Sequence, residues 1–111
     1  MDTQTYQNAT TEQPELRHLD VISGNDPELG YHAAAWIGDE LVVQVNRAAS
    51  QADALRRLDE LLADEIVHHT WAGGAFNVGA GTQAYHRRHT DLIVLRRIAT
   101  AKLREVIRSD A

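Results

Sequence analysis

The first half of the chain alternates short apolar runs with turn residues, a pattern typical of β-strands. It predicts three strands, over residues 16–23, 31–37 and 40–46. A cluster of Gly, Asn, Asp and Pro at 24–30 separates the first two strands, and Gly38-Asp39 separates the last two. Two residues of this type form a tight hairpin loop, so the second and third strands are predicted to pair antiparallel.

The two-residue loop also predicts which side chains share a face of the sheet, because side chains alternate along a strand. If Ile37 pairs with Glu40, one face holds six residues, and this face is the more apolar: Trp36, Ala34, His32, Leu41, Val43 and Val45. We therefore expect it to face the core. His32 would then lie on or near the core as a structural residue with its hydrogen bonds satisfied.

The middle of the chain changes to a helical period. An apolar stripe runs at helical spacing through Leu55, Leu58, Leu62 and Ile66, and His69 continues it. Ser50 is the predicted N-cap, with Asp53 in the position of the capping-box acid. We expect this helix to end near His69 and to be followed by a glycine-rich loop over residues 70–81, with a short strand at 75–78.

The last part of the chain predicts a long helix from an N-cap at Thr82 to about Arg108. Its inward stripe is Tyr85, His89, Leu92, Leu95, Ala99, Leu103 and Val106. Further apolar residues widen the stripe, namely Ile93, Val94, Ile98 and Ile107. This surplus predicts a homo-oligomer that associates through the helix, and ordinary core packing is the alternative.

Together these elements predict an α+β domain over residues 16–111, preceded by a disordered polar tail at 1–15. The domain is a three-stranded antiparallel sheet packed by one helix, then a glycine-rich loop and a long C-terminal helix. The chain has 111 residues and no cysteine, which excludes disulfides and thiolate metal sites. It shows no apolar leader and no run long enough to span a membrane, so we expect a cytoplasmic protein with no membrane partner.

Acidic and basic residues are distributed unevenly along the chain. Residues 1–81 hold thirteen acidic and four basic residues, whereas residues 82–111 hold three acidic and seven basic ones. A basic C-terminal helix suggests nucleic-acid binding through residues 82–108 as one alternative. The other reading is that the basic helix packs against the acidic body of the same protein. The face proposed for nucleic acid carries Arg87, Arg88, Arg96, Arg97 and Arg104.

Four of the six histidines and four of the seven glycines fall between positions 68 and 89. His68, His69, His86 and His89 are candidate ligands for zinc or nickel, because two histidines one helical turn apart can chelate a metal. The alternative is that these histidines cap helix ends. Candidates for binding an anion or another ligand lie in the same segment: Gly79, Gly81, Thr82, Arg87, Arg88, Trp71 and Tyr85.

The strand order, with Gly30-Tyr31-x-Ala33 and Ser50-Gln51-Ala52-Asp53-Ala54, resembles HicB-type antitoxins over about a third of the chain. The Pro-Gly elements expected between the two segments are absent, so no residue role is carried over from that family. No nucleophile set accompanies the histidines. The sequence thus favours a small non-catalytic binding or assembly protein of a microbe or phage. Such a protein would self-associate and act through a protein partner. The alternatives are a nucleic-acid-binding protein and a metal-dependent enzyme or metal-binding protein.

Overall fold

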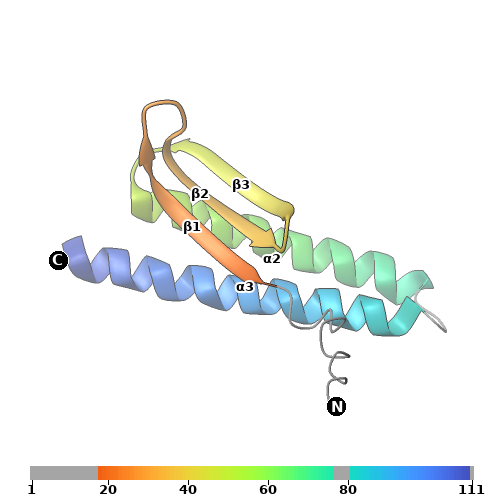
Figure 1. Cartoon of the computed structure of the whole chain (residues 1–111). Coiled ribbons are helices and arrows are strands. Elements are labelled where there is room, and N and C mark those ends of the chain that lie inside the picture. Colours follow the sequence, from red (N-terminus) through yellow and green to blue (C-terminus); the bar gives the residue numbers. More distant parts are fainter. Residues whose placement is uncertain (1–17, 77–80, 111) are drawn as a thin grey trace, which may run out of the picture.

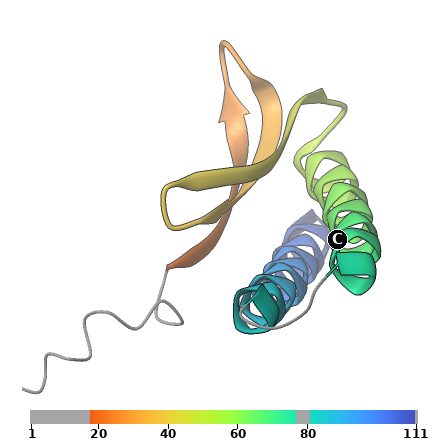
Figure 2. The same cartoon turned by 90° about the vertical axis from the view of Figure 1, so that its right-hand side faces the viewer.

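The computed structural model describes residues 18–76 and 81–110, without the side chains of 72–76, 81, 82 and 110. The elements follow in the order β1 (Leu19–Asp26), β2 (Gly30–Ile37), β3 (Glu40–Ala48), α2 (Gln51–Phe76) and α3 (Gly81–Asp110) (Figure 1). The three strands form one antiparallel sheet in the order β1-β2-β3. The predicted α+β class is confirmed, and the two helices pair as an antiparallel hairpin on one face of the sheet (Figure 2).

The first strand ends three residues later than predicted, because the turn after it is short. Residues 16 and 17 of the predicted strand lie outside the described residues. The Asp26 carboxylate accepts hydrogen bonds from the backbone N–H groups of Glu28 and Leu29, at 2.9 and 2.6 Å. The carboxylate thus accepts hydrogen bonds from two backbone N–H groups that have no partner strand in the turn. Gly24 therefore stays in the sheet, and β1 pairs with β2 from Leu19 opposite Ile37 to Asp26 opposite Gly30.

The predicted core face of β2 is wrong, and a β-bulge in β3 is the reason. The hairpin starts as expected, with Trp36 opposite Leu41, but Ala35 then lies opposite Val43, so Val42 has no partner. One extra residue exchanges the two faces of one strand relative to the other. The β2 residues in the core are consequently Ala33, Ala35 and Ile37, while Trp36, Ala34 and His32 lie on the outer face.

On β3 the predicted core face is partly confirmed. Val45 is buried and Val43 packs against the core, as predicted, whereas Leu41 is exposed. His32 lies away from the core and is satisfied locally, since its Nδ1 is 3.0 Å from the Gly30 carbonyl oxygen. The interpretation of His32 as a structural residue therefore holds on the opposite face of the sheet.

The core lies between the sheet and the helix hairpin. From α2 it takes the predicted stripe, and from α3 it takes the middle of the predicted stripe; the fully buried leucines are Leu55, Leu58, Leu62, Leu92 and Leu95. The start of α2 is also as predicted, because the Ser50 hydroxyl accepts a hydrogen bond from the Asp53 N–H at 3.0 Å. The Asp53 carboxylate in turn accepts one from the Ala49 N–H at 3.0 Å. These bonds satisfy backbone donors that a helix start leaves open.

The predicted loop over residues 70–81 is wrong for most of its length. Helix α2 continues through Phe76, so Ala75 and Phe76 are helical rather than part of a strand. Two consecutive glycines cost a helix only about 1 kcal/mol each, which packing against a neighbouring helix can offset. His68 and His69 therefore lie two turns before the end of the helix, where they cannot cap it.

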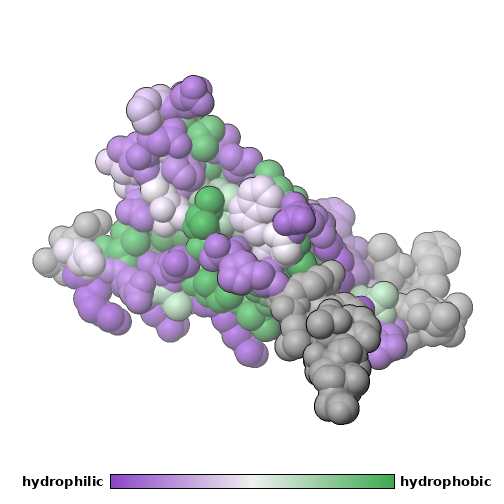
Figure 3. Space-filling view, viewed as in Figure 1, coloured by the Kyte–Doolittle hydropathy of each residue, from purple (hydrophilic) through white to green (hydrophobic). Residues whose placement is uncertain are grey.

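Helix α3 begins at Gly81, one residue before the predicted N-cap Thr82, and continues to Asp110. Part of the surplus apolar surface on α3 is used within the chain, because Ile98 packs against the core together with Leu103 and Val106. Ile107 remains exposed. Figure 3 shows apolar residues gathered along the seam between the strands and α3, with polar residues around them. Within the described residues, neither helix is long and apolar enough to cross a membrane.

Candidate functional site

The far end of the helix hairpin holds a stack of three rings. His69 from α2 lies flat on Tyr85 from α3, with ring centroids 4.3 Å apart and an interplanar angle of 14°. The His89 ring lies 6.1 Å from each of them and nearly parallel. The two sides of the hairpin thus meet at His69 and His89, as the two apolar stripes predicted.

Hydrogen bonds give this stack a structural role. His69 Nε2 donates to the Tyr85 backbone carbonyl at 2.9 Å, so the proton of a neutral His69 lies on that nitrogen. His89 Nδ1 is buried and has no hydrogen-bond partner within the described part of the chain. The stack joins α2 to α3. At the end where α2 finishes and α3 begins, the paired helices extend beyond the strands (Figure 1).

The four candidate metal ligands do not form one site. His68 is exposed and its Nδ1 donates to the Asp64 backbone carbonyl at 2.9 Å. His86 contacts Tyr85 edge-on at 5.3 Å. Across residues 18–76 and 81–110, no three side chains of metal-ligand type come together. The geometry therefore gives zinc or nickel no support, because a structural zinc ion takes four ligands and a catalytic one takes three.

The candidate residues for anion or ligand binding are also separated. Arg88 points to the sheet and forms an ion pair with Glu40 at 2.9 Å. Arg87 lies with His86 beside a shallow depression on α3. Trp71 is 77% exposed. Gly79 lies outside the described residues, as does the side chain of Thr82, and Gly81 is the first residue of α3.

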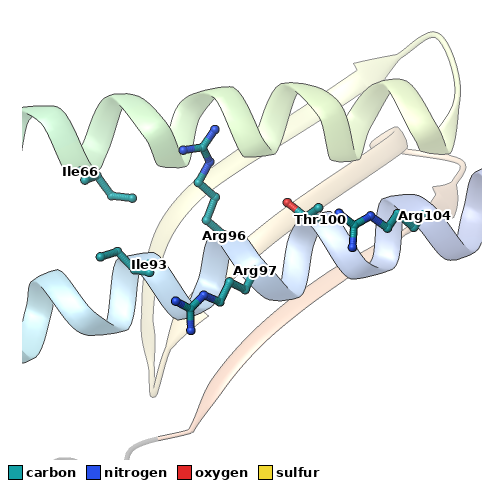
Figure 4. A pocket seen from close by; sticks show the side chains of 6 residues that line it. All are labelled: Ile66, Ile93, Arg96, Arg97, Thr100 and Arg104. Atoms are coloured by element: carbon teal, nitrogen blue, oxygen red, sulfur yellow. The ribbon is translucent and has the colours of Figure 1, made fainter.

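A groove between α2 and α3 opens on the face of the hairpin that points away from the sheet (Figure 4). It has a volume of about 410 Å³ and is lined by Ile66, Ile93, Arg96, Arg97, Thr100 and Arg104. Ile66 and Ile93 face each other across it, so its middle is apolar (Figure 4). All three arginines were candidates for nucleic-acid binding on the sequence, but nothing in the sequence showed that a groove would form beside them.

The arginines of the groove differ in their partners. Arg96 crosses to α2 and donates to both oxygens of the Asp59 carboxylate, at 2.8 and 3.3 Å. This hydrogen bond, followed by the charge of Asp59, raises the pKa of Arg96. Arg97 and Arg104 are exposed and form no ion pair with any described residue. They are seven residues apart, which places them two turns apart on one side of α3.

Helix α2 carries an exposed stripe in addition to its buried leucine stripe, and this exposed stripe was not predicted from the sequence. Its members follow spacings of four, three and four, and so share one side of the helix: Glu60, Asp64, Val67 and Trp71. Val67 is 56% exposed, and the carboxylates of Glu60 and Asp64 form no ion pair within the described chain. The signal was present, because Val67 and Trp71 lie off the core stripe at helical spacing.

No protein-family model, curated protein or solved structure matches this chain.

Proposed function

We propose that the protein is a small non-catalytic binding and assembly protein that self-associates and acts through a protein partner. One observation carries this proposal: the surface of the hairpin exposes large apolar side chains and unpaired charges of both signs. Val67 and Trp71 project from α2, and Arg97 and Arg104 project from α3. Apolar patches bordered by charges are typical of protein–protein interfaces, because such surfaces gain free energy when a partner excludes water from them.

The shifted pKa values support structural rather than chemical roles for the groups concerned. Hydrogen bonds from the Leu29 and Ala49 backbone N–H groups are the largest causes that lower the pKa of Asp26 and Asp53. These carboxylates belong to the β1–β2 turn and the start of α2. The third shifted group is Arg96, which links the two helices.

The structure gives less support to nucleic-acid binding than the sequence did. Of the five arginines proposed for that face, Arg88 and Arg96 are already bound to Glu40 and Asp59. Each internal ion pair removes a cation that could otherwise neutralise a phosphate. The unpaired Arg97 and Arg104 also line the groove that contains Ile66 and Ile93. Charged groups beside apolar side chains suit a protein partner better than a nucleic acid.

Analytical ultracentrifugation of the purified chain over a wide range of concentrations tests the proposal. We expect the average mass to rise from the 12.4 kDa of one chain as the concentration increases. A mass that stays at one chain throughout would remove self-association from the proposal. A matched run in high salt shows whether charge contributes, because salt screens exposed ion pairs.

A further inference from the structure

We propose that the groove between α2 and α3 binds a small amphipathic anion, that is, an apolar chain that ends in an oxyanion. One end of the groove contains Ile66 and Ile93, and the other end contains Thr100 and Arg104 (Figure 4). Its volume of about 410 Å³ lies in the lower part of the range of small-ligand sites. The site adds a ligand to the surface for which a protein partner is proposed above, and it requires neither that partner nor self-association.

The polar end of the groove has the groups that bind an oxyanion. The side chain of Arg104 runs along α3 toward Thr100, which projects between the two helices (Figure 4). Arg104 forms no ion pair with any described residue, and Arg97 is a second such cation within one turn of Thr100. Guanidinium groups match the geometry of a carboxylate or phosphate, and the hydroxyl adds a further donor. None of the six lining residues is acidic, so an oxyanion at this end meets no like charge in the lining.

Arg96 separates the two ends without adding a free charge to the groove. It lies between the isoleucine pair and Thr100, and its guanidinium crosses to α2, where it donates to both oxygens of the Asp59 carboxylate (Figure 4). The charge of Arg96 is thereby balanced within the chain, while its methylene stem covers part of the lining. The lining consequently changes from apolar to cationic over the seven residues from Ile93 to Thr100, a rise of about 10 Å. This change sets the direction of a bound amphiphile.

Other occupants suit this lining less well. The Arg96–Asp59 contact ties α2 to α3 across the groove, so a partner helix, which is about 10 Å wide, can rest on its rim but cannot enter it. A nucleic acid would gain little, because the lining offers it two unpaired cations, Arg97 and Arg104. A purely apolar molecule would cover these cations without pairing their charge, which is unfavourable. A narrow chain with one anionic end satisfies both parts of the groove.

Titration of the isotope-labelled protein with decanoate, followed by amide NMR, tests the site. Decanoate is kept below the concentration at which it forms micelles. It should shift the amide signals of Ile93, Thr100 and Arg104 most strongly, and the shifts should saturate. Decanol has the same chain without the charge, and decyltrimethylammonium reverses the charge. Each should bind at least about tenfold more weakly than decanoate, because the charged hydrogen bonds to the head group are lost.

Two substitutions address the two ends of the groove. Arg104→Gln should weaken decanoate binding by about tenfold, because the head group loses a charged donor, and it should leave the affinity for decanol unchanged. Ile93→Ala should weaken the binding of both compounds by about fivefold, because less apolar surface is buried. Lys102→Gln is the matched control. It also removes one positive charge from α3, but Lys102 lies beside β1 rather than in the groove, so decanoate binding should not change.

Circular dichroism checks that each variant is folded, and Arg97→Gln repeats the charge removal if Arg104→Gln folds poorly. Shifts that spread over the whole chain or never saturate indicate detergent-like binding and overturn the site. Equal affinity for decanoate and decyltrimethylammonium also overturns it, as does wild-type affinity of the arginine variants.

Ultracentrifugation with and without decanoate keeps this inference separate from the proposed function. A chain that self-associates but does not bind decanoate retains the proposed function and loses this site. A chain that stays monomeric and binds decanoate in the groove keeps the site and loses self-association.

Discussion

Two neighbouring leucines on α2 provide a direct test of the packing described above. Leu62 is fully buried between α2, α3 and the sheet, whereas Leu61 is 37% exposed. The substitution Leu→Ala removes the same atoms at both positions and changes helix propensity equally. Any difference in stability therefore reports the environment of the side chain.

The expected magnitudes follow from burial. Leu62→Ala should lower the free energy of unfolding by about 3 kcal/mol, since it removes buried methyl groups and leaves a cavity that the core fills only in part. For a domain of this size that loss lowers the Tm by about 10–20 °C. Leu61→Ala should cost about 1 kcal/mol or less, because much of its surface already meets water.

Urea unfolding followed by far-ultraviolet circular dichroism measures both values. All chains should be compared at the same concentration, because the proposed self-association would stabilise the folded state. Equal losses for the two variants would refute the placement of Leu62 in the core and of Leu61 at its edge. A larger loss for Leu61→Ala would indicate that α2 is rotated relative to the sheet.

The other predictions concern single local features. Ser50→Ala should destabilise the fold by about 1 kcal/mol in a thermal melt, because the Asp53 N–H loses its acceptor, whereas Ser50→Asp should retain most of the stability. Asp53 has a pKa below its usual 3.8, so the stability it contributes is complete above about pH 4 and is lost as the pH falls through the lowered value. Acid unfolding of Asp53→Asn should therefore depend less steeply on pH, and an unchanged profile would contradict the assignment. Gly38→Val should cost about 1–2 kcal/mol in urea unfolding, since φ is +59° at this hairpin position, and Gly38→Asn should cost less. Fluorescence anisotropy with a labelled duplex DNA should show little binding even at low salt, and tight, salt-sensitive binding would favour the nucleic-acid alternative.

The sequence predicted the elements well where local chemistry decides them. The Gly38-Asp39 loop, the Ser50 cap and the leucine stripe of α2 each depend on residues close in the chain. Periodicity over several turns also identified the core side of α3. These features need no knowledge of the tertiary fold, because hydrogen bonds and spacing within a few residues specify them.

The errors arose where one residue or one packing contact changes a longer pattern. A single unpaired residue, Val42, exchanged the faces of β2, and no periodicity rule reveals a bulge before the strands are paired. Glycines at 73 and 74 suggested a loop, yet the helix continues through them. Propensity is a weak determinant when a neighbouring helix is available for packing.

The candidate site was harder to predict because tertiary contacts decide which of its charged side chains form ion pairs and which stay exposed. Arg88 and Arg97 look equivalent in the sequence, but the fold pairs Arg88 with Glu40 and leaves Arg97 exposed beside the groove. His69 and His89 were correctly expected to approach each other across the hairpin. The spacing of the histidines could not show that His69 Nε2 would donate a hydrogen bond to a backbone carbonyl.

The extension of the hairpin beyond the strands has a consequence for the distribution of stability. Around the His69–Tyr85 stack the two helices contact each other and reach the sheet through the exposed Arg88–Glu40 ion pair, whereas the middle of both helices packs on the sheet (Figures 1 and 2). Amide hydrogen exchange should therefore occur there through local opening, at a lower free energy than exchange near Leu58 or Leu95. The molecule would then open at this end of the hairpin while its sheet-backed half remains closed.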